Sequence, residues 1–188
     1  MSVIAQAGAK GRQLHKFGGS SLADVKCYLR VAGIMADYSQ PDDMMVVSAA
    51  GSTTNQLISW LKLSQTDRLS AHQVQQALRR YQSELISGLL PPEVADGLIG
   101  AFIHDLERLA GLLDSGVNDA VYAEVVGHGE VWSARLMSAV LNQQGLESAW
   151  LDARDFLRAE RGAQPQVDEG LSYPLLQQLL AQHPGKRL

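Results

Sequence analysis

The chain has 188 residues, of which 46% are apolar and 19% charged, proportions typical of one soluble globular domain with a sizeable core. A net charge of −4 argues against a nucleic-acid-binding surface, and no apolar run approaches the roughly 20 residues that span a bilayer. The single cysteine, Cys27, excludes an internal disulfide and a cysteine-built zinc site, and it fits a reducing cytosol. Residues 1–11 lack the features of a signal peptide and are expected to be a flexible tail.

Residues 16–24 have the pattern of a strand, a glycine turn and a helix start. The apolar approach at residues 13–17 predicts the strand, and Ser21 and Asp24 have capping-box spacing, so a helix is expected to begin here. The N–H groups of the turn, the positive helix end and the charge of Lys16 suit a phosphate. A purely structural turn stays open, because the lysine precedes the glycines instead of following them as in a Walker A loop.

The expected first helix presents an apolar face, and Cys27 on that side is expected to be a buried packing residue. Its apolar positions are Leu22, Val25, Leu29, Ala32, Ile34 and Met35.

Residues 44–47 form a short unbroken apolar run, which predicts a strand buried on both faces of a parallel sheet. A hydroxyl-rich loop at 48–55 and a helical pattern at 57–63 follow. Two strand–loop–helix units indicate an α/β layered fold, with ligands at the carboxyl ends of the strands.

Residues 66–113 read as a long helical region without catalytic residues, interrupted by the Gly-Leu-Leu-Pro-Pro run at 88–92, with Ser70 as a cap. A further helix is expected from Asn118 to about residue 141. It contains Gly-His-Gly-Glu at 127–130, and its glycines indicate either a break or a close approach. Two interpretations of Glu130 stay open: a ligand-binding carboxylate, or a residue at the rim of a close helix contact.

The last part of the chain predicts a short strand at 148–151, a polar loop at 162–170 and a helix from 173 or 174 to 182. The Pro-Gly pair and the basic residues that follow this helix normally lead into another strand. We therefore expect a fold that is truncated on its C-terminal side.

Three separated segments resemble motifs of the aspartokinases, a branch of the amino-acid kinase family, in the family's order. Residues 16–24 (Lys-Phe-Gly-Gly-Ser-Ser-Leu-Ala-Asp) are similar to its opening motif, in which threonine is usual at Ser20. Residues 47–55 are similar to its Ser-Ala-x-x-Gly-x-Thr-Asn loop, and residues 127–134 to its Gly-Glu-x-x-Ser segment. The resemblance covers essentially the whole chain and is greatest to the N-terminal part of enterobacterial bifunctional aspartokinase/homoserine dehydrogenases of type II.

The resemblance implies a three-layer αβα sandwich with a mainly parallel sheet, and ATP-dependent phosphorylation of the L-aspartate side chain in the cytoplasm, the first step of lysine, methionine and threonine biosynthesis. The phosphate contacts would come from Lys16, Gly18, Gly19 and Ser20, with Lys16 stabilising the transferred group. Aspartate would be bound by Ser48, Thr54 and Glu130, the last facing its ammonium group. Mg²⁺ would accompany ATP, NADP would serve only a dehydrogenase domain absent here, and a homo-oligomer is expected.

Residues 12–188 would then be the N-terminal portion of a kinase domain that lacks the nucleotide-binding half, inactive alone. Two other hypotheses stay open. The chain could be a helical interaction module with a subunit interface at residues 66–141, or a family member that acts on glutamate, carbamate or uridylate. The loop at 48–55 and Glu130 argue against the latter, because they suit an α-amino acid with a charged amine.

Overall fold

The computed structural model describes residues 11–160 and 165–188. The tail expected at residues 1–11 therefore lies outside the described residues except for Gly11, and the polar loop is described only from Pro165 onward. The chain forms, in order, β1 (Leu14–Phe17), the 3-10 turn η1 (Gly19–Leu22), α1 (Val25–Tyr38), β2 (Met44–Val47), α2 (Thr53–Ser64), α3 (Arg68–Leu89), α4 (Pro92–Asp114), α5 (Asp119–Gln143), α6 (Ala153–Phe156) and α7 (Glu169–Gln182).

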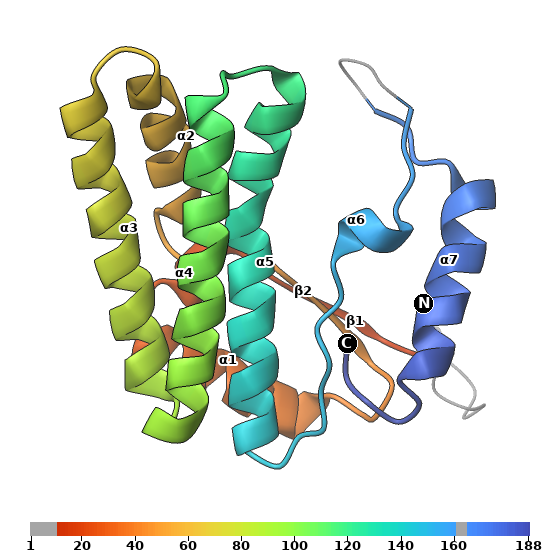
Figure 1. Ribbon diagram of the computed structural model, residues 1–188. Helices are drawn as coiled ribbons and strands as arrows, with labels where there is room; N and C mark the ends of the chain where they lie inside the picture. Colours follow the sequence, from red (N-terminus) through yellow and green to blue (C-terminus); the bar gives the residue numbers. More distant parts are fainter. Residues whose placement is uncertain (1–10, 161–164) are drawn as a thin grey trace, which may run out of the picture.

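The two strands are parallel, and helices lie on both sides of them. Figure 1 shows α2 to α5 on one side of β1 and β2, and α6 and α7 on the other. The expected α/β architecture with a parallel sheet is thus confirmed. In the described part of the chain, no helix has the length and apolar character needed to cross a membrane.

The largest apolar core lies among the helices. Leu57, Leu78, Leu109 and Leu136 come from four different helices and are at most 1% exposed. An edge-to-face contact of Phe102 and Trp132, with centroids 4.8 Å apart, joins α4 to α5, and α5 in turn lies on β2. The long region predicted to be helical, now α3 and α4, therefore packs on α2 and α5, and α5 is the helix of this group that contacts β2.

The expected first helix begins later than predicted. Ser21 is not its cap: its backbone N–H donates to the carbonyl of Gly18 within the turn η1. Asp24 caps α1 by accepting a hydrogen bond from the N–H of Cys27. Leu29 is 46% exposed and Cys27 is half-buried, so the prediction that they pack inside was wrong. The buried face of α1 is rotated, because the chain turns once more before the helix starts.

Other elements also differ in detail from the sequence-based expectation. α3 is capped by Asp67, whose carboxylate accepts from the N–H of Leu69 and Ser70, so Ser70 is not the cap. α7 begins at Glu169, four residues before the predicted start. Val46 in β2 is 46% exposed, which contradicts a strand buried on both faces.

The sheet continues beyond β2 through the last residues of the chain. The N–H of Leu188 donates to the Asp43 carbonyl, 3.1 Å away, so residues 187–188 run beside β2. On their other side, Arg187 donates to the Glu147 carbonyl and accepts from the N–H of Ala149, each at 2.9 Å. Sheet pairing after the Pro-Gly pair is therefore confirmed for residues 187–188, whereas the strand predicted at 148–151 is reduced to a single bridge at Ser148.

Asp43 fixes the start of the sheet. This buried carboxylate accepts from the N–H of Gln13 at 2.8 Å and of Gln40 at 2.7 Å, and it lies 3.5 Å from His15 Nε2. Burial raises the pKa of the Asp43 carboxyl, but the N–H groups of Gln40 and Gln13 and the neighbouring His15 outweigh burial and leave the pKa below its ordinary value of 3.8.

We expect Asp43→Asn to lower the free energy of unfolding by about 1–3 kcal/mol near neutral pH, because an amide N–H₂ would face N–H donors. Asp37→Asn, at an exposed position of α1, is the matched control and should change little. Because the folded pKa of Asp43 is below 3.8, its contribution is complete above about pH 4 and is lost as the pH falls through the folded pKa. Denaturant unfolding at several pH values checks this, and a difference between the variants that stays constant down to about pH 2 would contradict it.

Candidate functional site

The loops that follow β1 and β2 are hydrogen-bonded to each other. The N–H of Ser48 donates to the Phe17 carbonyl at 3.1 Å, and the N–H of Gly51 donates to the Gly19 carbonyl at 3.0 Å. A Cβ on Gly19 would lie 2.7 Å from the carbonyl oxygen of Ala49, closer than such atoms approach. Glycine is therefore required at position 19 by close contact between the loops.

Helix α5 reaches the same loop at its middle. Gly127 and Gly129 do not break the helix, which runs unbroken from Asp119 to Gln143. A Cβ on Gly129 would lie 2.7 Å from the Cβ of Ala49 and 3.3 Å from Cγ2 of Thr53, so the glycine permits a close approach. The carboxylate of Glu130 turns to this loop, where its Oε1 accepts from the N–H of Ala49 at 3.3 Å. The glycines of α5 therefore permit a close contact between the helix and the loop and do not break the helix, and Glu130 lies beside that contact.

The uncapped helix end near this loop belongs to α2. Its N-cap Ser52 makes no side-chain capping bond, and among the described residues the N–H groups of Thr54 and Asn55 have no hydrogen-bond partner. The start of α1, by contrast, is already occupied by the carboxylate of Asp24. The positive helix end expected at residues 16–24 is therefore supplied by α2, where it suits a carboxylate or phosphate oxygen.

Lys16 lies at the end of β1 and its side chain bends back over the turn. Its Nζ is 4.0 Å from the place that a Cβ of Gly18 would take. Lys16 and Ser20 are both exposed, so the ammonium and hydroxyl groups are open to a ligand. The lysine therefore sits at the carboxyl edge of the sheet, beside the loops that meet there.

The seven residues predicted from the sequence all lie at this edge. Gly19, Ser48 and Glu130 are brought together around Ala49, within direct contacts of the two loops and α5. The others occupy the adjoining turns, namely Lys16, Gly18, Ser20 and Thr54. Segments about 80 residues apart in the sequence thus build one edge, as expected for ligand sites of parallel sheets.

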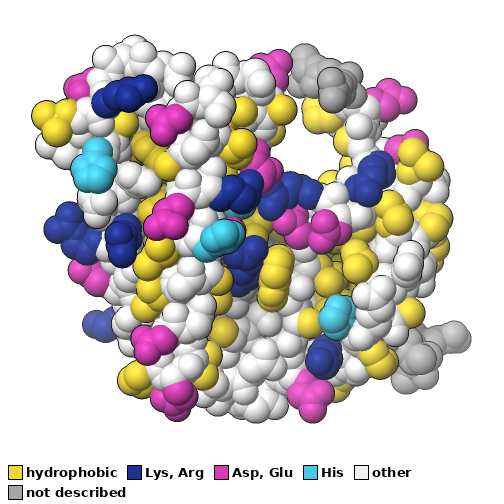
Figure 2. All heavy atoms as spheres, in the orientation of Figure 1, with side chains coloured by type: hydrophobic (Ala, Val, Ile, Leu, Met, Phe, Trp, Pro, Cys, Tyr) yellow, Lys and Arg dark blue, Asp and Glu magenta, His cyan; other side chains and the backbone are white. Residues whose placement is uncertain are grey.

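A chain of ion pairs beside this edge was not anticipated from the sequence. Arg154 pairs with Asp152 and, at 2.7 Å, with Glu124, which also pairs with Arg108 at 2.9 Å. The hydrogen bonds that Asp152 accepts from Arg154 hold the pKa of the Asp152 carboxyl below its ordinary value. Figure 2 shows basic and acidic side chains gathered at the centre of this face. The partners lie in α4, in α5 and just before and within α6, so only the tertiary structure could reveal the pairing.

His128 is the buried member of this network. Its Nε2 lies 2.8 Å from Arg108 Nη2 and its Nδ1 lies 2.6 Å from the Glu124 carbonyl. Because the guanidinium can only donate, Nε2 accepts and Nδ1–H donates, which assigns a neutral ring. Burial lowers the pKa of His128 from its ordinary value and favours the same state.

Known proteins match this chain along most of its length. The sequence profile of the Amino acid kinase family matches residues 11–186. The chain is 90% identical over 188 residues to Bifunctional aspartokinase/homoserine dehydrogenase 2 of Escherichia coli, covering 100% of this chain and 23% of that protein. It is 28% identical over 144 residues to Lysine-sensitive aspartokinase 3 of E. coli, covering 76% of this chain and 31% of that one. The chain therefore spans less than a third of the length of either relative.

Solved structures agree. The chain resembles E. coli aspartokinase III in complex with aspartate and ADP, with a TM-score of 0.77 and 25% identity over 94% of this chain and 39% of that one. The likeness to the same enzyme in complex with lysine and aspartate has a TM-score of 0.79 at 23% identity, covers 94% of this chain and 40% of that one, and supports the fold alone. The expected fold is confirmed, and the chain belongs to the amino acid kinase family.

Proposed function

We propose that the chain carries the aspartate side and part of the phosphate side of an aspartokinase site. The reaction transfers the γ-phosphoryl group of ATP to the side-chain carboxylate of L-aspartate and forms 4-phospho-L-aspartate. The observation that carries the proposal is the meeting of Glu130 with the uncapped start of α2 around the loop at residues 48–54. A carboxylate beside free N–H groups is complementary to an α-amino acid, which presents an ammonium and carboxylates together.

Each predicted residue has a physical role in this reaction. Glu130 faces the substrate ammonium, and Ser48 and Thr54 donate hydrogen bonds to its carboxylates. An aspartate carboxylate is ionised at pH 7, so no general base is needed, and catalysis rests on alignment and charge neutralisation. Lys16 supplies a positive charge to the transferred group, and the backbone of Gly18, Gly19 and Ser20 supplies hydrogen-bond donors.

Mg²⁺ belongs to this proposal as part of the nucleotide substrate. Among residues 11–160 and 165–188, no group of three or more His, Cys, Asp or Glu side chains is placed to hold a metal ion. We therefore infer that Mg²⁺ enters bound to the phosphates of ATP. The relative solved in complex with aspartate and ADP supports aspartate and a nucleotide as the two substrates. NADP would serve only the dehydrogenase part of a bifunctional relative.

The setting of the reaction is also proposed. We place it in the cytoplasm, because the single half-buried Cys27 fits a reducing compartment. A homo-oligomer stays a prediction. Carbamate and uridylate lack an ammonium group for Glu130 to meet, so they are weaker substrates for this geometry than aspartate, and glutamate is the competitor to test.

Kinetics of Glu130→Gln test the proposal. The protein to use is a full-length hybrid, in which these 188 residues replace the matching region of the E. coli bifunctional relative. We expect the KM for aspartate to rise by about 10- to 100-fold, as for the loss of a hydrogen bond to a charged group, with the KM for ATP nearly unchanged. Glu107→Gln, at an exposed position of α4, is the matched control and should leave both constants unchanged.

A different outcome would reassign Glu130. If Glu130→Gln leaves aspartate kinetics unchanged and only lowers the melting temperature, the carboxylate serves the contact of α5 with Ala49 and does not bind substrate.

A further inference from the structure

Two neighbouring polar residues of α3 reach the candidate site from the layer of helices. Tyr81 is half-buried and Gln82 is 3% exposed. A polar side chain on the buried face of a helix is stable only when it is hydrogen-bonded, so its partners show what the helix holds in place. Tyr81 reaches the loops that follow β1 and β2, and Gln82 reaches the start of α2.

The Tyr81 hydroxyl lies in the corner between the two loops. It donates to the Ala23 carbonyl at 3.0 Å, at the end of the turn that follows Lys16. The same oxygen is 2.9 Å from the place that a Cβ of Gly51 would take, so it leaves no room for a side chain there. Burial raises the pKa of Tyr81 above its ordinary value, and the hydroxyl therefore stays protonated and donates.

The two loops touch each other at this corner. The N–H of Gly51 donates to the Gly19 carbonyl, and a Cβ on Gly51 would lie 3.5 Å from Cα of Ala23. Gly51 also has a positive φ of 52°, which favours glycine at the bend of the loop. The hydrogen bond of Tyr81 to Ala23 therefore fixes the turn that follows β1 against the loop that follows β2.

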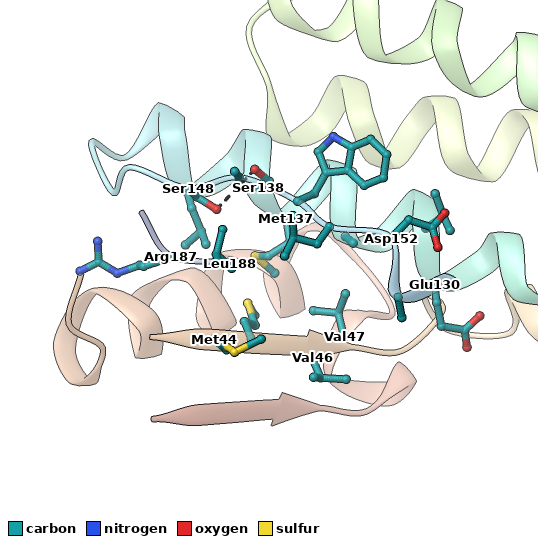
Figure 3. A pocket seen from close by; sticks show the side chains of 18 of the residues that line it. Met44, Val46, Val47, Glu130, Met137, Ser138, Ser148, Asp152, Arg187 and Leu188 are labelled. Carbon is teal, nitrogen blue, oxygen red and sulfur yellow. Dashed lines mark hydrogen bonds between the residues drawn. The ribbon is translucent and has the colours of Figure 1, made fainter. Parts of the chain in front are cut away.

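Gln82 holds only the second of these loops. Its Nε2 donates to Oγ1 of Thr53 at 3.1 Å, and Thr53 is fully buried as the first residue of α2. On its other side Thr53 lies against Gly129 of α5. Figure 3 shows Glu130, the next residue of α5, beyond the Val47 end of β2. Gln82 thus fixes the start of α2 near Glu130 and makes no hydrogen bond to the turn after β1.

We propose that Tyr81 is a positioning residue for phosphoryl transfer, which aligns the turn at residues 16–24 with the loop at 48–54. This inference rests on the proposed function, in which the turn binds the phosphates and the loop binds aspartate. Transfer requires the attacking carboxylate and the γ-phosphate to lie in line, so it depends on how these two loops are set against each other. Tyr81 bonds to the backbone and to none of the proposed binding groups. Its loss therefore leaves both substrates their ligands but loosens their alignment.

Tyr81→Phe and Gln82→Met in the full-length hybrid test this inference. For Tyr81→Phe we expect kcat to fall by about 10-fold while both KM values stay within about two-fold, since misalignment slows transfer more than binding. Gln82→Met removes the donor to Thr53, and we expect the KM for aspartate to rise by about 3- to 10-fold with kcat nearly unchanged. Tyr38→Phe, at a position 69% exposed at the end of α1, is the matched control and should change neither constant.

Hydrogen exchange of the same proteins gives a readout that does not depend on activity. Tyr81→Phe should speed the exchange of peptides from both loops, at residues 19–24 and 48–53, whereas Gln82→Met should speed it only in the second. A Tyr81→Phe protein that matches the control in kcat and exchange, or that raises only the KM for aspartate, would overturn the inference. If the unaltered hybrid forms no aspartyl phosphate, the proposed function fails, and exchange of the two loops alone decides whether Tyr81 joins them.

Discussion

Replacing Lys16 by methionine is expected to lower kcat of the full-length hybrid by about 10³-fold, because the transferred phosphoryl group loses a positive charge in the transition state. The melting temperature should hardly change, since the Lys16 side chain is exposed and bends over the turn without closing the core. Steady-state kinetics with saturating ATP and aspartate measure this.

Lys62→Met is the matched control, because Lys62 is an exposed lysine in the last turn of α2, at the other end of that helix from the loop at residues 48–54. It removes the same charge from the chain and should leave kcat unchanged. A Lys16→Met protein with nearly normal kcat would remove Lys16 from the mechanism and leave the glycine turn as a structural feature.

The two glycines of α5 should respond in opposite directions to alanine. In an ordinary helix alanine is more stable than glycine by roughly 1 kcal/mol, and a Cβ on Gly127 meets nothing within 4 Å, so Gly127→Ala should stabilise the chain. A Cβ on Gly129 would meet the Cβ of Ala49 at 2.7 Å and press on Thr53. Gly129→Ala should therefore lower the free energy of unfolding by about 1–2 kcal/mol, the cost of overpacking less the helix gain.

The same clash should also weaken aspartate binding. Moving Ala49 displaces the loop that carries Ser48 and the start of α2, so Gly129→Ala should also raise the KM for aspartate in the hybrid while Gly127→Ala does not. Denaturant unfolding and aspartate kinetics on both variants check the pair. Equal behaviour of the two would mean that α5 does not position the loop.

Much of the fold follows from local pattern. The apolar run at residues 44–47 predicted β2, and the change from a strand to a helical period predicted α2, because these signals lie within a few residues. The cap of α1 could not be predicted reliably, since Ser21 and Asp24 can both cap and the choice depends on how the turn η1 packs. Exposure of Leu29 and Val46 depends on which faces are covered by other elements, and an apolar residue does not specify this.

The candidate site was likewise predictable only in part from the sequence. Short motifs identified Gly19, Ser48 and Glu130, because each motif holds its own residue types at fixed spacing. Their meeting around Ala49 could not be predicted from the motifs. It depends on the close contact of α5 with the loop, which lies about 80 residues away in the sequence. The uncapped start of α2 was missed, because Ser52 before Thr53 has the sequence of a capped helix but makes no side-chain capping bond.

The most direct test of the account is whether the hybrid phosphorylates aspartate. Acyl phosphate formed from ATP, Mg²⁺ and either aspartate or glutamate can be trapped with hydroxylamine, and homoserine dehydrogenase activity of the hybrid verifies that it is folded. We predict aspartyl hydroxamate from aspartate at a rate comparable to that of the E. coli relative, little product from glutamate, and none from the 188-residue chain alone. A hybrid with full dehydrogenase activity that forms no aspartyl hydroxamate, or that prefers glutamate, would contradict the assignment of these residues to an aspartokinase site.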